Sequence, residues 1–162
     1  MTIEKRHLPT LPKGYELHVK RFDELTNKEL YELLRIRSSV FIVEQNCVYQ
    51  DLDQLDYTAT HLWITKGENT IAMCRICPPG TYMEALSLGR IISTERGKGY
   101  GMLMVKAALD VAKENFPDSP YIEIKAQTDK AEFYEKFGFK STSDPFMFEG
   151  LSHTYMRKDS AR

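Results

Sequence analysis

Residues 93–116, STERGKGYGMLMVKAALDVAKENF, place three glycines and the cations Arg96 and Lys98 directly before a long run of helical spacing. They follow LSLGRIIS, residues 86–93, whose apolar and β-branched residues predict a strand. A glycine-rich turn from a strand into a helix exposes backbone N–H groups at the positive end of the helix dipole, where anions bind. We therefore expect this loop to bind a negatively charged group.

The spacing of the glycines argues against two common phosphate-binding loops. A P-loop requires GxxxxGK[ST], but Gly99 follows Lys98, and Ile92 stands five residues before Gly97. A dinucleotide fingerprint requires GxGxxG, and here Met102 occupies the third glycine position. No clear βαβ repeat surrounds the loop either, so a third type of anion site is favoured.

The rest of the chain predicts a single domain that mixes strands and helices. A capping box formed by Thr26 and Glu29 marks the start of the first helix. We expect strands at 15–22, in a hairpin over 61–80, and at 86–93, 121–127, 139–143 and 153–158, with helices at 29–45, from the glycine loop to 115, and at 130–137. This order predicts an α/β (α+β) fold with a mixed, mostly antiparallel sheet flanked by helices. The predicted domain covers 15–158, between an irregular arm (1–14) and a tail (159–162).

Composition excludes several classes of protein. The chain has 162 residues and a formal net charge of −1, whereas nucleic-acid binders normally carry a strong basic excess. Without an apolar run of about 18 residues or a secretory signal, we expect no membrane contact and a cytoplasmic location. Cys47, Cys74 and Cys77 are expected to be reduced, structural and at least half-buried. No metal is expected, because a zinc site would need further ligands at suitable spacing.

The pattern Arg96-x-x-Gly99-x-Gly101, after LGRIIS and before a long helix, resembles the acetyl-CoA pyrophosphate loop of the GNAT superfamily of N-acetyltransferases. Further along, YIEIKAQ and AEFYEKFGF are similar to the strand and short helix that follow this loop in the superfamily. LRIRSSVFIVEQNCVYQDLDQLD, HLWI, RGKGYG, FYEKFGF and EGLSHTYM, in this order, resemble its ElaA subfamily over about residues 16–158. The resemblance implies the GNAT acyl-CoA N-acyltransferase fold and direct transfer of acetyl from acetyl-CoA to a primary amine of a small molecule or protein.

Carried over by position, the resemblance also implies a donor site. Strand backbone groups would bind the pantetheine arm, the glycine loop would bind the pyrophosphate, and one strand-end amide would complete the site: Ile91, Ile92, Ser93, Arg96, Gly97, Lys98, Gly99, Tyr100, Gly101 and Gln127. Tyr134, in FYEKFGF, matches the position of the general acid that hydrogen-bonds the leaving sulfur. Because an ordinary tyrosine pKa of about 10 exceeds that of a thiol, about 8.5, we expect Tyr134 to assist by hydrogen bonding and late protonation.

The acceptor side is less well defined by the sequence. Glu44, in the subfamily's VEQ segment, is a candidate base or amine ligand. The residues predicted beside it, in and around an acid-rich loop that would suit a cationic amine, are Gln45, Tyr49, Asp56 and His61. His153, near the last strand, is a second candidate on the acceptor side. A solvated acidic loop is the alternative for Asp51 and Asp53, and a purely structural histidine is the alternative for His153.

Two alternative functions and the oligomeric state remain open from the sequence. The domain could bind acetyl-CoA as a sensor or regulatory module without transferring it. The loop could instead bind a dinucleotide, which predicts stabilisation by NADH and not by acetyl-CoA. A homodimer formed through exposed strand edges is compatible with either function.

Overall fold

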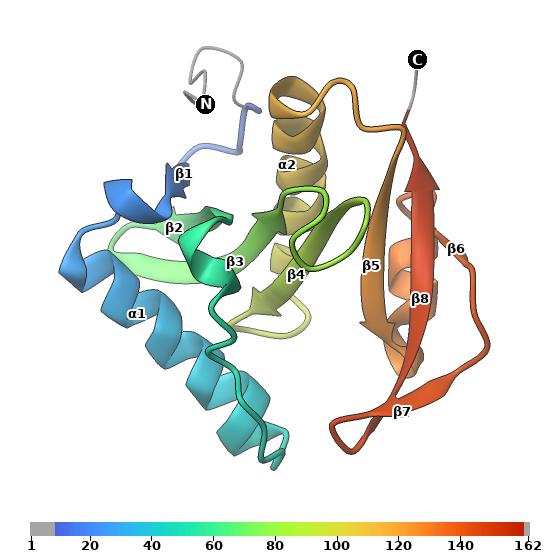
Figure 1. Ribbon diagram of the computed structural model, residues 1–162. Helices are drawn as coiled ribbons and strands as arrows, with labels where there is room; N and C mark the ends of the chain where they lie inside the picture. Colours follow the sequence, from blue (N-terminus) through green and yellow to red (C-terminus); the bar gives the residue numbers. More distant parts are fainter. Residues whose placement is uncertain (1–8, 161–162) are drawn as a thin grey trace.

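The computed structural model describes residues 9–160, and a mixed sheet of eight strands forms the centre of this part of the chain (Figure 1). The strands are β1 (Tyr15–Arg21), β2 (Thr60–Lys66), β3 (Asn69–Cys77), β4 (Leu86–Ser93), β5 (Tyr121–Gln127), β6 (Lys140–Ser141), β7 (Phe146–Phe148) and β8 (Leu151–Asp159). Their order in the sheet is β1-β2-β3-β4-β5-β8-β6, and β7 pairs with β8. Only β4 and β5 run parallel; the other pairs are antiparallel. Residues 1–8 and 161–162, in the predicted arm and tail, lie outside the described residues.

Three α-helices accompany the sheet: α1 (Asn27–Arg37), α2 (Tyr100–Asn115) and α3 (Ala131–Glu135). The predicted capping box starts α1, because Thr26 Oγ1 accepts from the Glu29 amide at 3.1 Å and Glu29 Oε1 accepts from the Thr26 amide at 2.9 Å. The helix continues as a π-helical segment, Ser38–Glu44. Within residues 9–160, no helix has both the length and the apolar character that crossing a bilayer requires.

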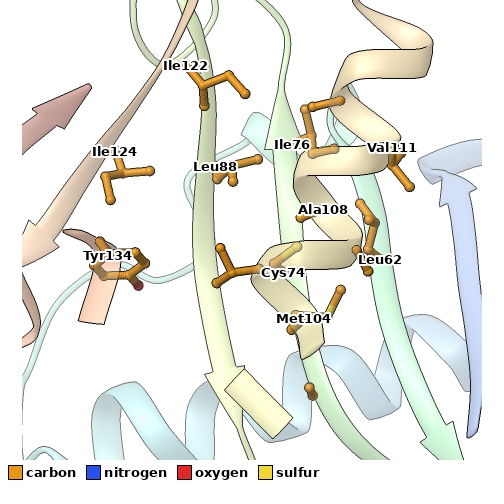
Figure 2. Close-up of a cluster of buried hydrophobic side chains, with 14 of the residues drawn as sticks. Leu62, Cys74, Ile76, Leu88, Met104, Ala108, Val111, Ile122, Ile124 and Tyr134 are labelled. Atoms are coloured by element: carbon orange, nitrogen blue, oxygen red, sulfur yellow. The ribbon is translucent and has the colours of Figure 1, made fainter. Parts of the chain in front are cut away.

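Strand alternation divides the apolar side chains between two cores, one on each face of the sheet. The larger core packs α2 against the sheet, and Figure 2 shows Met104, Ala108 and Val111 of that helix facing Leu62 and Ile76 of the strands. The smaller core joins Leu33 and Ile36 of α1 to the strand residues Trp63, Met73 and Ile92. The α1 side of the sheet is therefore only partly covered by apolar packing, which leaves room for polar groups further along the same face.

The predicted mixed, mostly antiparallel sheet flanked by helices is confirmed, with three local differences. The first helix is a regular α-helix only to Arg37, because the serines and β-branched residues that follow are weaker helix formers. The strand expected at 139–143 contains only Lys140–Ser141. The strand Phe146–Phe148 was not predicted, because three residues are too few to show an alternating pattern. The outer strands of the described sheet are β1, β6 and β7, and a homodimer through such edges stays a prediction.

Candidate active site

The site begins where β4 separates from β5. The two parallel strands are in register only at Leu86 with Ile122 and at Ser87 with Glu123. Beyond these pairs β4 stays with β3, whereas β5 pairs with β8 along its whole length. Figure 1 shows the two strands diverging, and side chains of both line a cavity of about 230 Å³. A parted sheet of this kind offers free strand backbone to an extended ligand.

A β-bulge bends β4 beside this cavity. Met73 pairs with Ile92 and Arg75 with Gly89, so two residues of β4, Arg90 and Ile91, lie opposite one residue of β3. Arg90 has a φ of 50°, in the left-handed region that non-glycine residues rarely occupy. Bulges disrupt the regular ladder and are frequent next to active sites. The predicted donor-site segment 91–93 follows the bulge and lines the cavity.

The glycine loop leads from β4 into α2. Gly97 and Gly99 have φ values of 74° and 75°, and a Cβ at either position would meet no atom within 4 Å. Glycine is therefore required at these two positions by the backbone conformation and not by close packing. Gly99 is the N-cap of α2 and provides no side-chain hydrogen bond, which leaves the first amides of the helix available to an anion. Gly101 differs, because a Cβ there would lie 3.5 Å from the Phe133 ring of α3.

The predicted donor residues of the loop divide by position. Arg96 lines the cavity, and its Nη2 donates to Glu44 Oε1 at 2.8 Å. Lys98 is exposed and does not line the cavity. The Tyr100 side chain is buried in the core, which leaves only its backbone for a ligand. The contact with Arg96 places Glu44 beside the glycine loop, at the donor end of the cavity.

Tyr134 projects from α3 into the gap between β4 and β5. Its ring packs edge-on against Phe133 and Phe139, with centroids 5.1 and 6.2 Å apart, and the residue also lines the cavity. Figure 2 shows the ring between the two strands. Burial, reinforced by the Cys74 thiol, raises the pKa of Tyr134 well above its ordinary value. The phenol therefore keeps its proton at neutral pH and can donate a hydrogen bond.

A family model described as an acetyltransferase (GNAT) domain matches residues 26–160 of the chain. The chain belongs to the GNAT acetyltransferase family. Among its relatives, Protein ElaA of Escherichia coli K12 is 34% identical over 140 residues, covering 84% of this chain and 91% of that protein. UPF0039 protein sll0451 of Synechocystis is 34% identical over 140 residues, covering 85% and 90%.

Solved structures agree with the sequence comparison. The crystal structure of an acyl-CoA N-acyltransferase from Pseudomonas aeruginosa superposes with a TM-score of 0.83 at 30% identity, covering 89% of this chain and 99% of that one. The crystal structure of Escherichia coli ElaA gives 0.83 at 32% identity, covering 90% and 99%. The resemblance to the ElaA branch of the GNAT superfamily and the acyl-CoA N-acyltransferase fold are thereby confirmed.

On the α1 side of the GNAT sheet, arginines of α1, β3 and β4 pair with the carboxylates of the acid-rich loop. Asp56 Oδ1 accepts from Arg37 Nη1 at 2.7 Å and from Arg75 Nη1 at 3.0 Å. The same guanidiniums and a third one pair with the other two carboxylates, forming what we call the arginine–aspartate network: Arg37, Arg75, Arg90, Asp51, Asp53 and Asp56. These carboxylates already have cationic partners, so the expected recognition of a cationic amine by the loop is not supported.

The network also explains the ionisation of its members. Burial acts to raise the pKa of Asp53, but the hydrogen bond and charge of Arg75, at 2.6 Å, outweigh it and lower the pKa to about 2. Burial raises the pKa of Tyr49 to about 12, against the charge of Arg90, and its hydroxyl donates to Asp51 at 3.3 Å. These groups keep one charge state across the neutral range, as a structural network requires.

The predicted acceptor residues do not all reach the GNAT cavity. Gln45, Tyr49 and His153 line it, and Gln45 Oε1 accepts from Gln127 Nε2 of the predicted donor site at 3.2 Å. Asp56 and His61 do not line it. His61 is buried behind the network, where its Nε2 donates to the Asp56 carbonyl at 2.9 Å and burial lowers its pKa. Asp56 and His61 are better explained as parts of the fold than as substrate ligands.

Among the cavity residues that the sequence reasoning missed are Tyr82, Ser87, Lys125 and Phe148. Lys125 lies in YIEIKAQ, whose alternation looks like that of any half-exposed strand, with the charged positions assigned to solvent. Tyr82 and Phe148 lie outside the motifs that carry the family resemblance. The strand pattern identifies which residues share a face of the sheet. It does not reveal that β4 diverges from β5 and that a cavity forms between them.

Proposed function

We propose that the chain is an N-acetyltransferase that moves acetyl from acetyl-CoA directly to a primary amine of a small molecule or protein. The observation that carries the proposal is the separation of β4 from β5 immediately beside the glycine loop and Tyr134. Membership of the GNAT family supports acyl transfer in general. The acetyl donor and the amine acceptor are the specific parts of the proposal.

The residues present fit such a donor. The first amides of α2, together with Arg96 and the left-handed backbone at Gly97 and Gly99, would hold the pyrophosphate. The pantetheine arm would lie along 91–93, where β4 has already left β5. Lys98, which is exposed outside the cavity, would contribute at most long-range attraction to the phosphates.

The chain must also manage two proton transfers. A lysine-like acceptor has a pKa near 10.4, so only about one molecule in two thousand is neutral and nucleophilic at pH 7. At the opposite end of the reaction, Tyr134 would donate its phenolic hydrogen bond to the leaving sulfur. Backbone amides at the bulge of β4, beside Arg90 and Ile91, are the natural donors to the thioester oxygen, where fixed dipoles stabilise developing negative charge.

The first test is thermal unfolding of the full chain with saturating acetyl-CoA, with NADH as the control. A ligand at one hundred times its Kd adds about 2.7 kcal/mol, which raises Tm by about 5 to 10 °C for a domain of this size. Stabilisation by acetyl-CoA alone supports the donor assignment, and stabilisation by NADH alone contradicts it. A second measurement, thiol release with amines, separates an enzyme from a sensor that binds the donor without transfer. Propionyl-CoA and longer acyl-CoAs in the same assay test whether acetyl is preferred.

A further inference from the structure

Lys125 carries a positive charge without an anionic partner in the described chain. It lies on β5 opposite Tyr155 of β8 and lines the cavity. Its Nζ is 3.2 Å from the centroid of the Phe148 ring and 5.1 Å from that of Tyr82, and within residues 9–160 it makes no ion pair. Aromatic faces attract an ammonium group, but they do not neutralise it. The cation is therefore held in place and still open to an anion.

The charged groups around Lys125 do not supply that anion. Asp53 already pairs with Arg75 and Arg90, and Glu149 is exposed to solvent in the turn between β7 and β8. Burial, followed by the charge of Arg90, lowers the pKa of Lys125 to about 8. At pH 7 about ten lysines in eleven would still be protonated, so the cavity retains the charge.

The remaining charged residues that line the cavity do not remove its excess of positive charge. Arg96 pairs with Glu44, and Lys130 is an exposed second cation at the end of β5. No carboxylate among the described lining residues lies within ion-pair distance of Lys125 or Lys130. The cavity as a whole therefore favours an anionic ligand over a cationic one.

Ser87 provides an independent observation on the neighbouring strand. It is 1% exposed and lines the cavity, and its Oγ has no hydrogen-bond partner among the described residues. In the strand register it lies opposite Cys77, whose thiol is close enough for a weak interaction only. Buried hydroxyls are normally well hydrogen-bonded, so this one is free to donate a stronger hydrogen bond to a ligand.

We propose that the acceptor amine carries an anionic group, a carboxylate or phosphate, which Lys125 and Ser87 bind beside the aromatic side chains of Tyr82 and Phe148. The proposal rests on the proposed function and defines its substrate class. Lys125 attracts the anion and Ser87 donates a hydrogen bond to it, which directs the amine of the same molecule toward the thioester. An amine without an anionic group meets Lys125 as a like charge. This differs from the expectation of a cationic acceptor drawn from the acid-rich loop.

The test uses matched pairs of amines in the thiol-release assay with acetyl-CoA. The pairs are phenylalanine with phenylalaninamide and 2-phenylethylamine, alanine with alaninamide, and phosphoethanolamine with ethanolamine, each corrected for its fraction of neutral amine. We expect kcat/KM for the anionic member of at least one pair to exceed that of its neutral partner by about 30-fold or more. The carboxylate and phosphate pairs decide which anion is preferred.

Variants show whether Lys125 is responsible. Lys125→Met is expected to reduce the preference to about threefold or less, mainly through KM, whereas Lys125→Arg should retain most of it. Ser87→Ala should lower kcat/KM for the anionic substrate by about three- to tenfold more than for the neutral one. Lys140→Met, at an exposed lysine outside the cavity, is the matched control and should keep the full preference.

A binding measurement keeps the two proposals separate. N-Acetylphenylalanine should raise Tm more than N-acetyl-2-phenylethylamine, with and without CoA, and Lys125→Met should abolish the difference while acetyl-CoA still stabilises the variant. If acetyl-CoA fails to stabilise the wild type, the proposed function fails, and the product pair still reports on the anion site. A neutral preference in every pair, a product pair without a difference, or a preference unaffected by Lys125→Met would overturn the inference.

Discussion

Two groups of charges on the α1 side of the sheet, both close to Arg90, behave in opposite ways. In the arginine–aspartate network, each guanidinium and each carboxylate has a partner within 3.3 Å. In the cavity beside it, the Lys125 ammonium has no anionic partner among the described residues, and the Ser87 hydroxyl has only the weak Cys77 thiol. The comparison indicates that an oppositely charged partner within the chain, more than the residue type, distinguishes charges that stabilise the fold from charges that can bind a ligand.

The largest expected effect comes from breaking the network. Arg75→Met removes one guanidinium and leaves the half-buried Asp53 and the buried Asp56 with one partner fewer. We expect a loss of about 3 kcal/mol of unfolding free energy in urea, because breaking a buried ion-pair network by removing one partner is strongly destabilising even though Arg37 and Arg90 still pair with the two carboxylates. The control is Arg35→Met, which removes an exposed pair with Glu32 and should cost about 0.5 kcal/mol or less. Equal losses in the two variants would show that the network is not structural.

The donor side should respond to the backbone of the glycine loop. Gly99→Val places a β-branched residue at a φ of 75°, which the loop can relieve only by moving. We expect acetyl-CoA affinity measured by calorimetry to fall about 100-fold, or about 2.7 kcal/mol. Gly67→Val introduces similar strain, at a φ of 61°, in the turn between β2 and β3. If Gly67→Val lowers acetyl-CoA affinity as much as Gly99→Val does, the glycine loop is not the donor-binding element.

Tyr134→Phe tests the phenolic proton. Because the raised pKa makes Tyr134 a reluctant acid but leaves it a hydrogen-bond donor, we expect kcat to fall about 10- to 100-fold without loss of acetyl-CoA binding. Steady-state kinetics compare it with Tyr121→Phe, a tyrosine outside the cavity. A kcat within twofold of the wild type would remove Tyr134 from the mechanism.

Acid should weaken the network through its carboxylates. The pKa of Asp53 is lowered from an ordinary value near 3.9 to about 2, so its contribution is present above about pH 4 and is lost as the pH falls toward 2. We expect the free energy of unfolding in urea to be about 1–2 kcal/mol higher for the wild type than for Asp53→Asn at pH 6. Near pH 2 the two free energies should be almost equal. A difference that does not change with pH would indicate that charge pairing is not its origin.

The smallest effect is expected at Glu44. Its contact with Arg96 is exposed, and such pairs contribute little. Glu44→Gln should therefore change both kcat and acetyl-CoA affinity by no more than about threefold, as measured by steady-state kinetics. A loss of 100-fold in kcat would instead establish Glu44 as the general base, the other role predicted from the sequence.

Prediction from sequence succeeded where the signal was local. The capping box at Thr26, the helix after the glycine loop and the burial of the three cysteines all follow from spacing or short-range chemistry and are confirmed. The arginine–aspartate network joins residues far apart in the chain, such as Arg37 and Asp56, so no local pattern reveals it. Lys125 was missed for a related reason: a lysine in an alternating strand appears solvent-exposed until the neighbouring strand is seen to diverge.

The short contact between β4 and β5 has a mechanical consequence. The ladder β1-β2-β3-β4 comes entirely from residues 15–93, and the ladder formed by β5 with the last three strands comes from 121–159. Two register pairs join these halves, and the segment containing α2 is the covalent link between them. A donor lying across the gap would therefore act as a brace between two separately built halves, adding cohesion where only two register pairs of strand pairing connect them.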